Sequence, residues 1–151
     1  MKRKTRMFGE VGVEDGELVF MDGGTHGVPG HTARVAPDGT MRWERRVDSM
    51  GEDRNTGEGS LCLDDRERAR LAGWAEAAFR LGDPGRPWPP PVPAEGPPSR
   101  PPEPPRYCWV VLLRRGAAIR AVEGDNWTGA PEELVPMMRW LVERVDRACT
   151  P

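Results

Sequence analysis

The sequence has few of the residues that build metal centres and disulfide frameworks. Its 151 residues include three cysteines and two histidines, and no two cysteines form a Cys-x-x-Cys pair. An odd cysteine count argues against a disulfide framework and for a reducing compartment. His26 and His31 stand five residues apart in a glycine-rich stretch, which is not the spacing of a zinc site. We therefore expect no metal, no cofactor and a cytoplasmic location.

Long hydrophobic runs and lysines are scarce as well. A membrane-spanning helix needs about 20 consecutive apolar residues, and no such run exists. Only two of the 22 basic residues are lysines, an arginine bias typical of GC-rich bacterial genomes. The basic tail at residues 1–7 carries four positive charges, but a polar segment follows it, so we do not expect a secretory signal. Four charges give a shallow electrostatic footprint, so a weak contact with nucleic acid or an anionic surface is only the alternative, and we expect neither a nucleic-acid nor a membrane partner. We interpret the tail as a solvated, frayed terminus.

Proline, by contrast, is abundant and concentrated. Residues 84–105 hold 12 of the 17 prolines. Proline lacks the backbone N–H and clashes with a preceding helical turn, so this stretch should be extended polyproline II. It is either a linker between two small modules or a long insertion inside one domain. Pieces shorter than about 70–80 residues seldom bury enough surface to fold alone. We therefore favour a single domain, 1–151, with a Pro-rich insertion at 84–105.

Hydrophobic periodicity predicts the elements on both sides of the insertion. Alternation predicts short strands, and apolar residues recurring every three to four positions predict helices. The helix start at Asp64 has the pattern of a capping box, with Glu67 three residues later. The run at 107–113 is apolar on both faces, as a central strand should be. The predicted elements are strands at 17–21, 31–35 and 40–46, a loop at 48–59, a helix at 64–81, strands at 107–113 and 117–122, and a last helix that ends near 148. This last helix begins either at Pro131, with a kink at Pro136, or near Leu134.

This order, β-β-β-α-(Pro-rich insertion)-β-β-α, predicts the α+β fold class. An antiparallel sheet of about five strands would carry two helices on one face. That arrangement covers the apolar strand at 107–113, which neither half of the chain could cover alone.

Catalytic chemistry has no good candidates in the sequence. The acidic residues cluster at two helix starts and in a predicted loop, where each has a structural explanation. No serine lies in a nucleophile elbow. The run Gly23-Gly24-Thr25-His26-Gly27 lacks the Lys-Ser/Thr of a phosphate-binding loop. We expect a protein that is not an enzyme.

The glycine-rich stretch between Asp22 and Gly30 is the most distinctive local feature. Loops held by a rigid sheet often carry binding residues, so this stretch is a candidate contact loop; the alternative is a long hairpin loop without a binding role. Trp88, between prolines, either docks into an aromatic-lined groove of a partner or folds back on its own domain. The candidate partner-binding residues are Gly23, Gly24, Thr25, His26, Gly27, Val28, His31 and Trp88.

Three segments together resemble a known family. They are Gly23-Gly24-Thr25-His26-Gly27-Val28, then Pro37-Asp38-Gly39-Thr40, then Leu61-Cys62-Leu63-Asp64-Asp65-Arg66-Glu67, followed by a hairpin and a closing helix. Over most of residues 17–147 the chain resembles the emfourin-type proteins, small bacterial inhibitors of protealysin-like metalloproteases. Thr25-His26 stands where the family has an aromatic–Ala pair, Leu63-Asp64-Asp65 replaces the family's helix-start triplet, and the Pro-rich insertion is extra.

The resemblance implies a non-enzymatic, metal-free inhibitor. Its glycine-rich loop would approach the cleft of a thermolysin-like metalloprotease, with Val28 as the apolar contact. The alternative function is a structural or assembly subunit of a larger bacterial complex that binds through its Pro-rich arm. Both hypotheses make the chain a protein-binding module.

Overall fold

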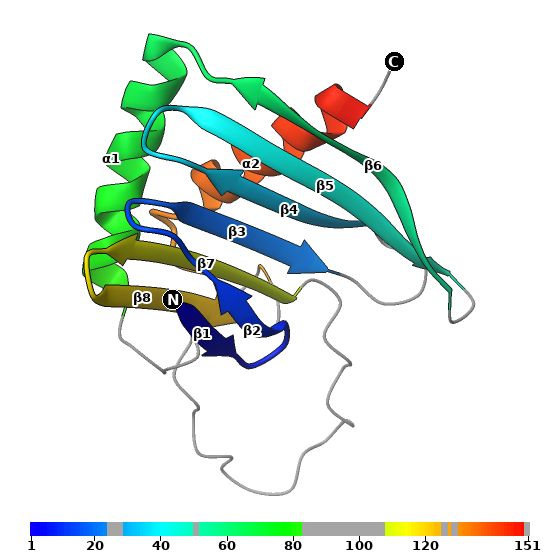
Figure 1. Cartoon of the computed structure of the whole chain (residues 1–151), viewed down its shortest axis with the longest axis horizontal. Helices are drawn as coiled ribbons and strands as arrows, with labels where there is room; N and C mark the ends of the chain where they lie inside the picture. Colours follow the sequence, from blue (N-terminus) through cyan, green and yellow to red (C-terminus); the bar gives the residue numbers. More distant parts are fainter. Residues whose placement is uncertain (24–28, 50–51, 83–107, 125–126, 128–129, 150–151) are drawn as a thin grey trace, which may run out of the picture.

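The structure, a computed structural model, describes residues 1–23, 29–49, 52–82, 108–124, 127 and 130–149. Its elements, in chain order, are β1 (Lys2–Thr5), β2 (Gly9–Gly12), β3 (Leu18–Gly23), β4 (Pro29–Val35), β5 (Thr40–Ser49), β6 (Glu52–Cys62), α1 (Asp65–Leu81), β7 (Cys108–Arg115), β8 (Ala118–Gly124) and α2 (Val135–Cys149). Figure 1 shows a broad sheet with α2 behind it, α1 along one end of the strands and the β1–β2 hairpin in front.

The main sheet has six antiparallel strands in the order β6-β5-β4-β3-β7-β8. Its centre is the pairing of β3 with β7, which runs from Leu18 opposite Leu113 to Gly23 opposite Cys108. Residues before and after the Pro-rich stretch therefore belong to one sheet (Figure 1).

Both helices pack on the same face of this sheet. The buried residues there include Phe20 from β3 and Trp109 from β7, which contact the cluster that also contains Leu71 of α1 and Leu141 of α2. The predicted α+β class, with an antiparallel sheet and two helices on one face, is confirmed in this respect.

The opposite face of β3 and β7 is apolar too, and the β1–β2 hairpin lies against it. Val11 and Val13 are buried with Val19, Val110 and Leu112 in a second, smaller cluster. The prediction of a frayed basic tail at 1–7 is wrong, because Lys2–Thr5 pairs with Gly9–Gly12. The physical reason is that the hairpin buries the apolar side chains on the second face of the central strands, which would otherwise be exposed to water.

The hairpin's turn is closed by the side chain of Thr5. Its hydroxyl donates to the Gly9 carbonyl at 2.8 Å and accepts from the Phe8 amide at 2.9 Å. Gly9 has a positive φ of 67°, which a residue with a side chain rarely adopts.

The prediction of a loop at 48–59 is wrong as well. This region holds the end of β5 and most of β6, so the main sheet has six strands rather than about five, and the hairpin forms a second, two-stranded sheet. The pairing places Gly59 opposite Trp43, whose indole would lie only 3.1 Å from a Cβ added to that glycine. The large side chain on β5 thus fills the space over the glycines of β6. Because β6 is mostly exposed and polar, it lacks the alternation that signals a strand.

The start of α1 matches its sequence signature. The Asp64 carboxylate accepts from the Glu67 amide at 2.8 Å, and the Glu67 carboxylate accepts from the Asp64 amide at 3.1 Å. The capping box is therefore confirmed, and the helix ends at Leu81, where the Gly82 amide donates to the Ala78 carbonyl.

Replacing the cap should destabilise the protein measurably. Asp64→Ala leaves the Glu67 amide without its acceptor, so we expect the free energy of unfolding to fall by about 1 kcal/mol. Urea unfolding followed by circular dichroism measures this loss. Asp65→Ala, which leaves the capping box intact, is the matched control and should cost only a few tenths of a kcal/mol. Equal losses in the two variants would contradict the role of the cap.

Candidate functional site

The predicted contact loop is only partly described. Gly23 is the last residue of β3, and its carbonyl accepts from the Cys108 thiol, with Sγ and O 3.2 Å apart. Six of the predicted contact residues lie outside the described part of the chain; they are Gly24, Thr25, His26, Gly27, Val28 and Trp88.

His31 is described, and its side chain is only 6% exposed. It lies on β4, opposite Asp22 of β3. The Nδ1 atom of His31 is 2.8 Å from Asp22 Oδ1, and Nε2 is 2.8 Å from Asp146 Oδ1 on α2. The His31 amide also donates to Asp22 Oδ1 at 2.8 Å. His31 therefore holds β3, β4 and α2 together, and is not available as an exposed contact.

The charges around His31 determine its protonation. Burial is the largest single influence and by itself lowers the pKa of His31. The hydrogen bonds and negative charges of Asp22 and Asp146 together outweigh it, so the net effect raises the pKa above the ordinary 6.5. The sequence contains no local signal for this cluster, because Asp146 is 115 positions away from His31.

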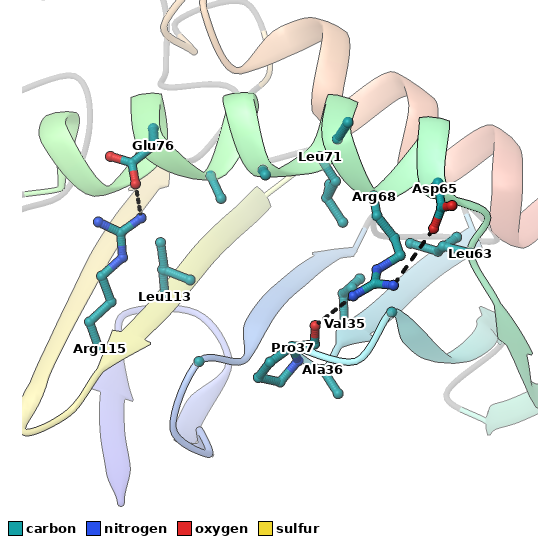
Figure 2. A pocket seen from close by; sticks show the side chains of 15 residues that line it. Val35, Ala36, Pro37, Leu63, Asp65, Arg68, Leu71, Glu76, Leu113 and Arg115 are labelled. Atoms are coloured by element: carbon teal, nitrogen blue, oxygen red, sulfur yellow. Dashed lines mark hydrogen bonds and ion pairs between the residues drawn. The ribbon is translucent and has the colours of Figure 1, made fainter.

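A more open feature lies between α1 and one end of the sheet (Figure 2). It is a groove of about 520 Å³. Its floor is made by apolar side chains from four elements or their flanks: Val35, Leu63, Leu71 and Leu113. This volume is within the range of ligand pockets, about 300–1,000 Å³.

Charged contacts stand at both ends of the groove. At one end the Arg68 guanidinium lies 3.9 Å from the Asp65 carboxylate and donates to the Pro37 carbonyl at 3.4 Å. At the other end Arg115 forms an ion pair with Glu76 (Figure 2). The guanidinium of Arg115 also lies over the ring of Phe79, 4.4 Å from its centroid. Both signs of charge are paired, so the groove has little net charge.

Small residues keep the groove open. On α1 the residues facing it include Ala69, Ala72 and Ala75, which follow one another at helical spacing. On the opposite side Gly39 has a φ of 90°, and a Cβ there would lie 2.7 Å from the Arg68 side chain. The spacing of these alanines is the one feature of the groove that is visible in the sequence, because the other lining residues come from segments far apart in the chain.

Neither a metal site nor a membrane-spanning helix is found among the described residues. In this part of the chain no group of three or more His, Cys, Asp or Glu side chains could hold a metal ion. Nor does any described helix have the length and apolar character needed to span a membrane. Compared with known protein families and with curated proteins, the chain matches none.

The pKa of His31 leads to a stability prediction. A raised pKa means that the folded state binds the proton more tightly than the unfolded chain. This stabilisation is fully present below about pH 6.5 and disappears as the pH rises through the pKa of folded His31. We expect His31→Gln to lower the free energy of unfolding by about 1.5–3 kcal/mol under mildly acidic conditions, the range for charged hydrogen bonds.

The measurement is a series of urea unfolding curves of wild type and His31→Gln at increasing pH. Titrating groups that do not contact His31 are the same in both proteins, so they cancel in the difference, and Asp22 and Asp146 are ionised over the pH range used. The difference should shrink as the pH rises past neutrality. A difference that stays constant with pH would show that His31 is not held as the cation.

Proposed function

We propose that this chain is a protein-binding module that holds a short apolar segment of another protein in the groove between α1 and the sheet. The observation that supports it is a groove of about 520 Å³ with an apolar floor between two sets of paired charges. A concave, mostly apolar lining with a few polar groups at its edges is characteristic of binding sites.

The dimensions of the groove suit a short extended peptide. Glu76 lies eight positions after Arg68 on α1, which corresponds to about 12 Å along a helix. An extended chain rises about 3.3 Å per residue, so three to four residues fit between the charged ends. Charged side chains would lose hydration over this floor, and the nearby carboxylates and guanidiniums already have partners. A neutral, apolar segment is therefore the best fit.

The more specific proposal follows the family resemblance. In it the chain is a non-enzymatic inhibitor of a thermolysin-like metalloprotease and works in the cytoplasm, where its three free cysteines stay reduced. The stretch from Gly23 to Val28 would contact the protease cleft, and the groove would hold a neighbouring protease segment. The second proposal remains an assembly subunit that binds through the Pro-rich arm at 84–105.

The groove can be tested with a small probe. The peptide acetyl-Ala-Val-Leu-Ala-amide should shift the NMR methyl signals of Leu63, Leu71 and Leu113 as it is titrated in. Ala72→Arg puts a long side chain into the groove, and we expect it to weaken this binding at least tenfold, which is about 1.4 kcal/mol. Gly73→Arg adds the same charge at the neighbouring exposed position, which does not line the groove, and should bind like wild type. If methyl signals elsewhere move and these three do not, the groove is not the site.

The inhibitor proposal has its own assay. Wild type should slow hydrolysis of a fluorogenic peptide by a thermolysin-like protease at near-stoichiometric ratio. Val28→Asp should abolish the inhibition, since it places a charge where an apolar contact is needed, while deletion of residues 86–103 should leave it intact. If deletion of residues 86–103 abolishes binding to the native complex and Val28→Asp does not, the result would favour the assembly subunit. No slowing by wild type at tenfold excess would reject the inhibitor.

A further inference from the structure

The two side-chain contacts of His31 require a proton on both ring nitrogens, whereas a neutral imidazole carries only one. Both ring nitrogens are 2.8 Å from carboxylate oxygens, one of Asp22 and one of Asp146. An ionised carboxylate only accepts hydrogen bonds, and a neutral imidazole donates from one nitrogen alone. Both contacts are satisfied together only when His31 is an imidazolium. The cluster is therefore built around a bound proton.

The two carboxylates differ in what they can do when that proton leaves. The Asp22 side chain is 7% exposed, whereas that of Asp146 is 47% exposed. Asp146 also has the Arg45 guanidinium, with Nε 3.2 Å from Oδ1. Asp22 has no comparable access to water, so neutral His31 would keep its remaining proton on Nδ1, toward Asp22. The contact that fails is the one between Nε2 and Asp146.

That contact joins β4 to the last turn of α2, which the Arg45–Asp146 ion pair, Val145 and Cys149 also hold to the sheet. Val145 is fully buried in the core, and the Cys149 thiol donates to the Thr56 carbonyl, with Sγ and O 3.3 Å apart. A carboxylate near a helix C-terminus is disfavoured by the helix dipole, which adds to the need of Asp146 for a cationic neighbour. Among the described residues, the charged groups that face His31 are Asp22 from β3 and Asp146 from α2, with Arg45 of β5 beyond Asp146.

We propose that the His31–Asp146 contact is a pH-dependent latch between β4 and the C-terminal end of α2. The latch is closed while His31 is protonated. When His31 becomes neutral, Asp146 keeps Arg45 and water but loses His31, so the end of α2 is held to the sheet by one contact fewer and opens more often. The Asp22–His31 contact persists in both states, so β3 and β4 stay joined. The mobility of the C-terminal end of α2 thus depends on pH, whether or not the proposed groove binds a partner.

Amide hydrogen exchange, measured by mass spectrometry across a pH series and corrected for intrinsic rates, tests the latch directly. In wild type, exchange in residues 141–149 should rise roughly five- to tenfold as His31 is deprotonated, the equivalent of one hydrogen bond. Exchange in β7 should not change. The NMR titration of the His31 ring gives the midpoint, which should be above 6.5 and coincide with the exchange transition.

Two variants separate the latch from general effects of pH. In Asp146→Asn the amide contacts His31 in either protonation state, so the exchange of the α2 end should lose its pH dependence, and the pKa of His31 should fall. Glu143→Gln removes a charge from the same helix at an exposed position and should behave like wild type. The proposal is overturned if the α2 end exchanges equally on both sides of the His31 transition, or if Asp146→Asn keeps the wild-type response.

Discussion

The structure depends on one constraint, which is that both faces of the β3–β7 pair must be buried. Phe20 and Trp109 point to the helices, while Val19 and Val110 point to the other side, and all four have at most 1% of their surface exposed. No single layer can cover two faces of a sheet. The helices therefore occupy one side and the N-terminal hairpin the other, and the remaining strands extend the sheet outward from this centre.

The polar cluster and the groove both lie where that packing ends. Asp22 and His31 continue the helix-facing rows of Phe20 and Ala33, one step farther along each strand. Because they are still covered by α2, they need charged partners, and Asp146 supplies one. At the other end of the sheet, the small residues of α1 leave a groove above the apolar row that ends in Leu113. One end of the core thus carries the His31–Asp146 contact and the other the groove between α1 and the sheet.

Local signals predicted some of this fold and missed other parts for physical reasons. The capping box at Asp64 and the doubly apolar run of β7 are short-range patterns, and both are found where expected. β6 was missed because its register depends on Trp43 of the neighbouring strand covering its glycines. The β1–β2 hairpin was missed because its burial depends on the second face of strands more distant in the chain. The partners of His31 and the walls of the groove come from separate segments, so only tertiary structure reveals them.

The constraint itself is tested most directly by removing the hairpin. Deleting residues 1–13 takes away Val11 and Val13, and burial of each contributes about 1.5–3 kcal/mol. Urea unfolding of the shortened chain should show a free energy of unfolding lower by about 3 kcal/mol or more, together with new binding of a hydrophobic dye. An unchanged unfolding midpoint would mean that the second face of β3 and β7 does not need its cover, and would contradict this account of the fold.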